Sequence, residues 1–362
     1  MIKIIIKLLY IYFFSLPFYF LKLSFLGGLS INQIVSVLII IFFIFYLIKN
    51  PIIFSNKIYN SFLLLIFIYS VFLIGNFNEW FVLVKNLLNV AFLGVLINLN
   101  KKIGFTQYSN IIILGFSLGM LVLVAIFFIS NYSLFVFTNF SYYKLTYGLF
   151  LNVYEFLNIG LEEDFNSSLI FRNTYGEIFA VLYLLVSNTP FRKMRVVYFL
   201  FTLISFSRRA IFTLIWYFSK YMKLKYILPI FLILFLFLNF NIFENNRVFS
   251  FEEETRLDQY INVFGSIDNV FLGAGFAESF EGRYIHNFIL SNFYTIGVIG
   301  LLISCWIYIL LVKSFFDSFI SSNYLYSSLF ILVILNLTVS SNVNGLLTPG
   351  AIIALSIASL KI

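Results

Sequence analysis

Residues Glu252–Gly300 read EEETRLDQYINVFGSIDNVFLGAGFAESFEGRYIHNFILSNFYTIGVIG, and this stretch decides how the rest of the chain is organised. It holds seven of the fifteen Asp and Glu residues and the only histidine, His286. The polar sequence ends at this histidine, where a long apolar run begins. Most of the remaining chain is apolar, so the fold depends on how this polar segment connects to the apolar segments around it.

The composition excludes an ordinary soluble protein. The 362 residues are 62% hydrophobic and 10% charged, whereas soluble domains carry about 25% charged residues. A chain with this much apolar surface is an all-α, polytopic membrane protein. Its net charge of +8 reflects the distribution of lysines and arginines about a membrane and does not indicate nucleic acid. The single cysteine, Cys305, excludes a disulfide within the chain and a thiolate metal cluster.

Twelve apolar runs approach the roughly 20 residues that cross a bilayer. They are Leu8–Leu26, Ile34–Ile48, Ile58–Ile74, Trp80–Ile97, Asn110–Ser130, Tyr175–Ser187, Val196–Phe206, Ala210–Ser219, Tyr226–Phe243, Ile285–Val312, Tyr324–Val339 and Leu347–Ala358. We therefore predict a single membrane domain over 1–362 with about twelve transmembrane helices. The first run lacks a small-residue cleavage site and is expected to remain as a signal anchor.

The segment Val196–Ser219 has two interpretations, a helical hairpin or one helix with Arg208 and Arg209 at its centre. Two arginines at mid-bilayer would cost several kcal/mol, so the hairpin, which places them at an interface, is favoured. With twelve crossings and both termini cytoplasmic, fourteen basic residues lie inside and seven outside, as the positive-inside rule expects.

Six of the eight arginines fall on the outer side in this topology. They are Arg172, Arg208, Arg209, Arg247, Arg256 and Arg283. The planar guanidinium suits bidentate binding of phosphate, so the cluster indicates an anionic ligand. The alternative is that these arginines pair with the carboxylates that gather on the same side.

Two outer segments are long enough to form more than a connection, namely 131–174 and 244–284. In the second, Ser250 and Glu253 form a capping-box pattern, which predicts a short amphipathic helix lying on the membrane. Arg256 lies beside Tyr260 at the edge of its apolar face, within reach of a lipid headgroup.

Other residues of the second loop have structural interpretations. Glu252, Glu253 and Glu254 complement the dipole of the predicted helix, which we favour over metal ligation. Gly273 and Gly275 allow tight turns that return the chain to the membrane.

His286 is either an interfacial anchor or a general base. It opens an apolar helix on the side that carries the six arginines, with Asn287 adjacent and Gly297 and Gly300 following, where small residues permit close packing. An imidazole with an ordinary pKa of about 6.5 can accept a proton from a sugar hydroxyl.

Three short motifs follow one another in the C-terminal half: Phe271-Leu272-Gly273-Ala274-Gly275, then His286-Asn287-Phe288-Ile289-Leu290, then Gly297-Val298-Ile299-Gly300. They resemble the signature region of the bacterial O-antigen polymerase (Wzy) and O-antigen ligase superfamily. Upstream, Ser207-Arg208-Arg209-Ala210 and Thr255-Arg256 are similar to two arginine-bearing motifs, and Arg172-Asn173-Thr174-Tyr175-Gly176 is similar to a patch that precedes a transmembrane helix. The resemblance covers about Arg172–Val312.

This resemblance implies a metal-independent membrane glycosyltransferase with a GT-C-like fold, no cofactor, and an undecaprenyl-pyrophosphate-linked donor on the periplasmic face of the inner membrane. His286 would be the base that activates the acceptor, with inversion of the anomeric carbon. Arg208 or Arg209, and Arg256, would bind the pyrophosphate; Arg209 stands where the family commonly has glycine, so either arginine is a candidate. Arg172 and Arg283 are further candidates, and Asn287, Tyr260, Gly273 and Gly275 would support the site.

The acceptor distinguishes two functions within this superfamily. A polymerase transfers glycan to another lipid-linked repeat unit, and a ligase transfers it to lipid A core. For a polymerase, a chain-length regulator protein is a candidate partner. We favour the polymerase. A flippase for lipid-linked oligosaccharide is a rival, but it needs polar groups along a central cavity, whereas the charges here gather at the two faces. A purely structural scaffold leaves the outer arginines unexplained.

Overall fold

The fold is taken from a computed structural model. The structure describes residues 1–18, 22–23, 29–51, 56–72, 80–130, 168–187, 189–205, 207–221, 270–273, 287–339 and 347–359. Its contacts divide the chain into two compact units. Unit 1 comprises Met1–Ile53 and Val95–Arg208, and unit 2 comprises Phe54–Gly94 and Arg209–Ile362. Each unit is described by itself.

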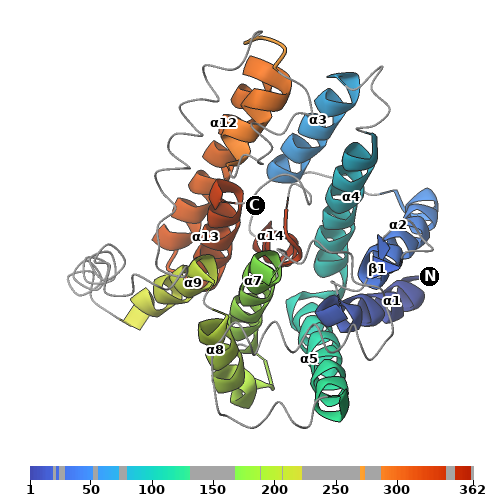
Figure 1. Cartoon of the computed structure of the whole chain (residues 1–362), viewed down its shortest axis with the longest axis vertical. Helices are drawn as coiled ribbons and strands as arrows, with labels where there is room; N and C mark the ends of the chain where they lie inside the picture. The colour runs from blue at the N-terminus through green and yellow to red at the C-terminus, as the bar shows by residue number, and fades with distance from the viewer. Residues whose placement is uncertain are drawn as a thin grey trace. The chain divides into compact units, whose positions relative to one another are not determined.

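The described residues are mainly helical (Figure 1). The α-helices are α1 (Ile2–Ser15), α2 (Ile31–Lys49), α3 (Lys57–Phe72), α4 (Trp80–Ile103), α5 (Phe105–Ser130), α7 (Ser168–Val186), α8 (Arg195–Ile204), α9 (Arg208–Phe218), α12 (Phe288–Ile320), α13 (Tyr324–Val339) and α14 (Pro349–Ala358). Short 3₁₀ turns η1 (Leu16–Phe18), η6 (Arg192–Met194) and η7 (Ser219–Tyr221) adjoin them. The strands β1 (Lys22–Leu23) and β2 (Leu29–Ser30) form one small antiparallel pair.

A helix occupies eleven of the twelve predicted apolar runs, and the other run, Tyr226–Phe243, lies outside the described residues. Among the residues that the structure describes, four helices are long and apolar enough to cross a membrane, within α2, α4, α5 and α12. The helical, membrane-compatible character of the chain is thereby confirmed. The count of twelve crossings stays a prediction, because helices such as α8 and α14 have 10 residues each and rise only about 15 Å.

The first predicted run was wrong in its boundaries. The helix begins at Ile2 and ends at Ser15, and β1 occupies part of the region predicted to continue to Leu26. Pro17 explains the end, because its ring fixes φ and it has no N–H with which to continue the helix. The chain then makes the turn η1 and enters the antiparallel pair, in which Lys22 faces Ser30.

Local sequence sets the other helix ends in unit 1. Ser30 and Gln33 form a reciprocal capping box at the start of α2, with the Ser30 N–H donating to Gln33 Oε1 over 2.9 Å. Gly104 ends α4 with φ +83°, and its N–H donates to the Asn100 carbonyl over 3.0 Å. Helix α5 starts at the next residue, so α4 and α5 are longer than predicted and meet at this glycine.

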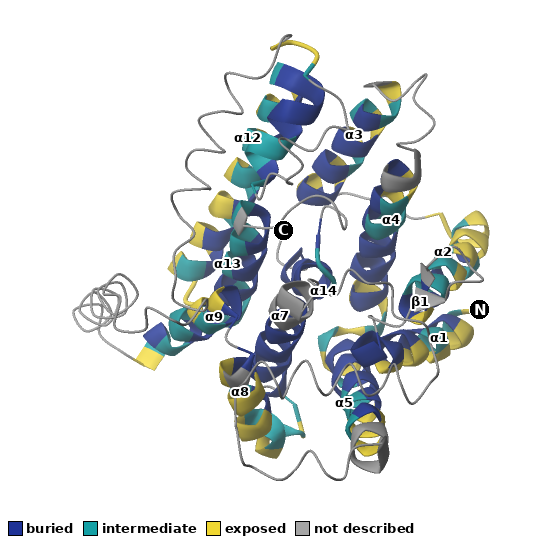
Figure 2. Cartoon of the chain, viewed as in Figure 1, coloured by how far each residue is buried: buried dark blue, intermediate teal, exposed yellow. Residues whose placement is uncertain are grey.

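Close helix packing holds unit 1 together. α1 packs on α5 and on α2, while α7 packs on α5 and α8. At Gly119 of α5 the backbone of α1 comes so near that an added Cβ would overlap the carbonyl oxygen of Phe14. Helix α7 is buried from Thr174 to Val186, as the dark blue ribbon in Figure 2 shows. It begins at Ser168, so the end of the loop predicted over 131–174 is helix.

Helices α8 and α9 are separate elements, which confirms the prediction that Val196–Ser219 is two helices. The last residue of α8 is Ile204 and the first of α9 is Arg208. A continuous helix would have carried both arginines in its middle, and the break places them at a helix start instead.

In unit 2, α12 packs on α3 and α13, and α13 packs on α14. The Trp216 ring of α9 packs in a tilted arrangement on Phe315 and Phe319 of α12, at ring-centroid distances of 5.1 and 5.4 Å. Helix α14 is buried along its whole length after Pro349. Thr348 caps it by accepting the Ala351 N–H, and the N1 proline needs no partner there.

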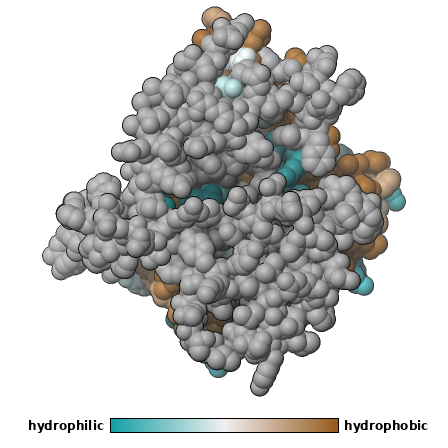
Figure 3. All heavy atoms as spheres, in the orientation of Figure 1, coloured by the Kyte–Doolittle hydropathy of each residue, from teal (hydrophilic) through white to brown (hydrophobic). Residues whose placement is uncertain are grey.

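Apolar side chains cover the exposed face of several helices. On α2 they include Ile41, Ile44, Phe45 and Ile48, the last of which is 74% exposed. Hydrophobic surface, coloured brown, is visible at the edge of Figure 3 near the place where Figure 1 labels α2. On α12 the exposed positions include Leu302, Trp306, Ile309, Phe316 and Ile320. Such faces are typical of helices that lie against lipid.

Candidate functional site

Helix α12 is not continuous, although it was predicted as one apolar run. Ile296 has φ −130° and ψ 22°, and Gly297 has φ 65° and ψ −151°, a conformation that residues other than glycine rarely adopt. The chain is helical on both sides, so α12 consists of a first segment, 288–295, and a second segment, 298–320. We call the whole element the α12 hairpin.

Side-chain contacts show that the first segment folds back along the second. Asn292 Nδ2 donates to Ser304 Oγ over 2.6 Å, although residues 12 apart in a straight helix are separated by about 18 Å. The rings of Phe288 and Tyr308 lie 6.2 Å apart between centroids. Phe288 lies four residues before Asn292, and its partner Tyr308 lies four residues after Ser304. This is the pattern of two antiparallel helices.

The turn Val270–Gly273 packs directly on the break in the α12 hairpin. Val298 N–H donates to the Val270 carbonyl over 2.9 Å. Gly273 has φ +75°, and an added Cβ would lie 2.6 Å from the Gly297 nitrogen; a Cβ on Gly297 would overlap the carbonyl of Phe271. Two motifs that lie apart in the sequence are therefore in contact, and both glycines are required by conformation and by space.

Asn287 caps the first segment of the hairpin. Its Oδ1 accepts the N–H groups of Ile289 and Leu290 at 3.0 and 3.1 Å, which satisfies two donors that a helix start leaves without intrahelical partners. Asn287 was predicted as a supporting residue next to His286, and the structure gives it this capping role. The predicted site residues His286, Arg256, Arg283, Tyr260 and Gly275 lie outside the described residues.

A second pair of motifs meets within unit 1. Gly176 of α7 lies against the link between α8 and α9, so that an added Cβ would lie 2.5 Å from Ser205 Oγ and would overlap the Cβ of Ser207. The Ser207 N–H donates to Ser205 Oγ over 3.3 Å. The patch ending at Gly176 thus supports the turn that leads into Arg208, while the side chain of Arg172 at the start of α7 lies outside the described residues.

The two adjacent arginines have different environments. Arg208 is exposed, whereas Arg209 is 9% exposed. Arg208 belongs to unit 1 and Arg209 to unit 2. The sequence left both residues as candidate phosphate ligands. In the structure, the Arg208 side chain lies at the surface and the Arg209 side chain lies within the helix packing.

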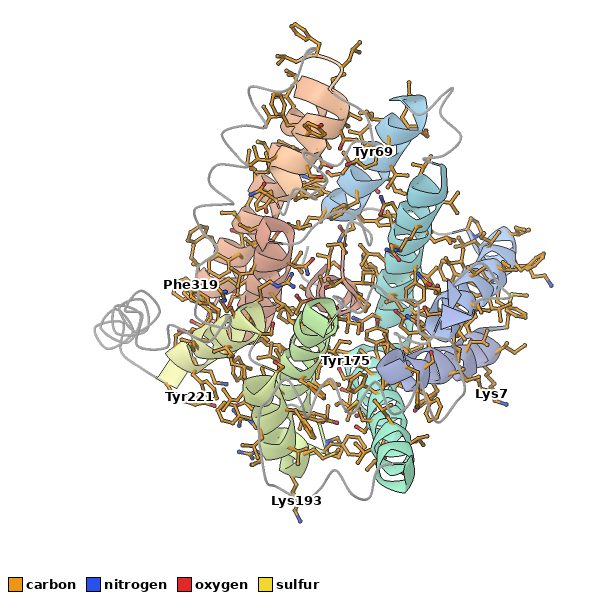
Figure 4. The ribbon with its side chains drawn as sticks, in the orientation of Figure 1. Lys7, Tyr69, Tyr175, Lys193, Tyr221 and Phe319 are labelled. Atoms are coloured by element: carbon orange, nitrogen blue, oxygen red, sulfur yellow. The ribbon has the colours of Figure 1, made fainter. Side chains whose placement is uncertain are left out.

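Sequence reasoning missed a series of hydrogen bonds between buried polar side chains inside unit 2. Tyr69 of α3 donates its hydroxyl to Asn292 Oδ1, and Asn292 donates to Ser304. All three residues are at most 1% exposed, and Figure 4 labels Tyr69 on α3 beside α12. The available signal was an asparagine and a serine flanking Gly297 in an otherwise apolar run.

These contacts define two candidate regions, one within each unit: the Asn287 helix start with its supporting hairpin in unit 2, and the Ser207–Arg208 turn in unit 1. In the part of the chain that the structure describes, no group of three or more His, Cys, Asp or Glu side chains could hold a metal ion. Comparison with known proteins found no matching family model, no similar curated protein and no similar solved structure.

Proposed function

We propose that this protein is a polysaccharide polymerase of the bacterial inner membrane. It transfers an undecaprenyl-pyrophosphate-linked glycan onto the next lipid-linked repeat unit, on the periplasmic face and with inversion. His286 removes the proton from the acceptor hydroxyl as that oxygen attacks the anomeric carbon. The bond to the pyrophosphate breaks, and arginines neutralise the charge that develops on this leaving group.

One observation carries the proposal. The turn Val270–Gly273 and the break at Gly297, which belong to two separate motifs of the resemblance, meet through a hydrogen bond and two glycines with positive φ. Their meeting supports a shared purpose, because each motif is needed for the geometry of the other. The first segment of α12, which begins after Asn287, ends at this arrangement.

The exposure of the arginines supports Arg208 as the phosphate ligand of the pair. An exposed guanidinium at a helix start can form two parallel hydrogen bonds to a phosphate in a lipid headgroup region. Arg209 is largely enclosed by protein, and its carbonyl accepts the Thr213 hydroxyl over 2.8 Å. We therefore assign Arg209 a part in holding α9 and Arg208 a part in binding the donor.

The deciding experiment deletes the gene in its native host and separates the cell-surface polysaccharide on a gel. The deletion is complemented with wild type, His286→Ala, Arg208→Ala and, as a matched control, Arg192→Ala, an arginine predicted to lie on the cytoplasmic side. A polymerase deletion leaves core capped by a single repeat unit. We expect only wild type and Arg192→Ala to restore the ladder, with all variants present at similar levels in the membrane.

Other gel patterns would contradict the proposal. Bare core with long glycan accumulating on the lipid carrier would identify the ligase reaction, in which the same chemistry has another acceptor. Purified protein mixed with lipid-linked repeat units distinguishes transfer from transport. Longer lipid-linked glycan should form without other proteins, and Arg208→Ala should slow its formation on the order of 100-fold. A flippase would leave the length of the glycan unchanged in this assay.

A further inference from the structure

The α12 hairpin places its own starting residue deep along a membrane-crossing segment. The second segment, 298–320, is about 35 Å long, and its apolar run ends at Val312, before the exposed Lys313. Tyr308 lies about 15 Å from the start of this segment, about half of the roughly 30 Å of hydrocarbon, and the Phe288 ring packs against the Tyr308 ring. Asn287 and the first turn that it caps therefore lie beside the middle of the second segment and not beside its end.

Buried contacts fix the first segment at that depth. Asn292 is fully buried and joins three elements, accepting from Tyr69 of α3 and donating to Ser304 of the second segment. The Phe288 ring lies between those of Phe62 on α3 and Tyr308, with centroid distances of 6.3 and 6.2 Å. Asn292 supplies the polar part of this attachment, and Phe288 supplies the apolar part.

The backbone at both ends of the first segment has partners within the protein. Asn287 accepts two N–H groups at the start, and its carbonyl accepts the Ser291 N–H over 2.8 Å. At the break, the Val298 N–H is bonded to Val270. Non-helical backbone at membrane depth requires such partners, because lipid offers none. Half-helices that begin near the bilayer midplane are a known way to build polar sites there.

We propose that the segment 288–295 is a re-entrant half-helix that holds Asn287 at mid-depth of the membrane, and that Asn292 is the positioning residue that fixes it. The proposal rests on the proposed function in one respect. If the proposed transfer takes place next to Asn287, the lipid-linked sugar must reach the reaction centre from within the membrane rather than at a surface loop. Asn292 itself touches no substrate.

A distance measurement tests the hairpin without any assay of activity. Full-length protein with Cys305→Ala receives cysteines at Ile289 and Ile320, which are then labelled with nitroxides in lipid nanodiscs. Antiparallel segments about 9 Å apart give a separation of about 20 Å, whereas a straight helix gives about 45 Å. A distribution centred near 45 Å would overturn the proposal, even if the protein proves to be a polymerase.

Substitution of Asn292 tests the positioning role. We expect Asn292→Leu to broaden the 289–320 distance and to lower kcat on the order of 100-fold, with KM for the lipid-linked donor little changed. Asn292→Asp, which stays protonated when buried and so keeps one acceptor and one donor, should restore both readouts. The matched control is Tyr308→Phe, which removes the part-buried hydrogen bond between Tyr308 of α12 and Thr338 of α13 and keeps the ring that packs on Phe288.

The outcomes separate the two proposals. If Asn292→Leu keeps the wild-type distance and kcat, or if Tyr308→Phe lowers kcat equally, Asn292 is not a positioning residue. If the protein elongates no glycan at all but the distance is near 20 Å and broadens in Asn292→Leu, the proposed function fails while the re-entrant half-helix stands.

Discussion

Two pairs of glycines, one pair in each unit, are used in opposite ways. In unit 1, Gly115 and Gly119 lie inside the continuous helix α5 and allow the backbone of α1 to approach it. In unit 2, Gly273 and Gly297 have positive φ and reverse the chain, so that a turn fits against a broken helix. Small residues therefore build close helix pairs in one unit and create an irregular, polar-supported structure in the other. Only the second use produces a helix start inside the packing.

The strongest test of this difference is Gly297→Ala. The substitution should lower the free energy of unfolding by about 3 to 5 kcal/mol, because the conformation is restricted to glycine and the new methyl group overlaps a backbone carbonyl. The expected result is a large drop in the apparent Tm in detergent, with loss of activity. Gly104→Ala is the control, since Gly104 has φ +83° but no atom within 4 Å of an added Cβ. It should cost only about 1 to 2 kcal/mol, and equal losses would contradict the steric explanation.

A smaller effect is expected in unit 1. Gly119→Ala forces α1 away from α5, which costs about 1 to 3 kcal/mol, partly offset by the better helix propensity of alanine, about 1 kcal/mol. Gly115→Ala is the matched variant, because its Cβ would lie 2.8 Å from the Phe13 Cβ and 3.1 Å from the Tyr10 carbonyl. Thermal unfolding should rank Gly119→Ala below Gly115→Ala, with the reverse order arguing against backbone packing as the cause.

The smallest change in stability is predicted for Ser207→Ala. The Ser207 Oγ is buried and forms no hydrogen bond with the residues that the structure describes. Removing a buried polar group without a partner is neutral or stabilising, so the apparent Tm should stay within about 2 °C or rise. A fall in glycan transfer at unchanged stability would indicate that this hydroxyl contacts substrate. A marked loss of stability would show that the hydroxyl has a structural role after all.

Hydropathy and the residues that interrupt the apolar runs predicted much of the helical framework. The apolar runs contain helices because a segment in lipid must satisfy its own backbone, which only a helix does without a partner strand. The break before Arg208 followed from the cost of burying two adjacent arginines at mid-bilayer. Where the boundaries were wrong, a local residue explains them, as Pro17 does for the end of α1.

The candidate site was less accessible to sequence reasoning. The motifs around Gly273, Asn287 and Gly297 could be selected by residue type. The contact between Gly273 and Gly297 could not be predicted, because these positions are more than twenty residues apart in the sequence. The sequence also left Arg208 and Arg209 equivalent. Their difference in exposure depends on how α9 packs, which no local pattern encodes.

The sequence by itself determined a chain of apolar helices with its polar chemistry concentrated around one histidine, since transfer free energies act residue by residue. The tertiary structure alone decided that the run after Asn287 folds back on itself. Periodicity and hydropathy are the same for a straight helix and for a re-entrant one. Two residues select the re-entrant form. Gly297 adopts a positive φ where Val270–Gly273 packs on it, and Asn292 bonds to Tyr69 of α3 and to Ser304, twelve residues along its own helix.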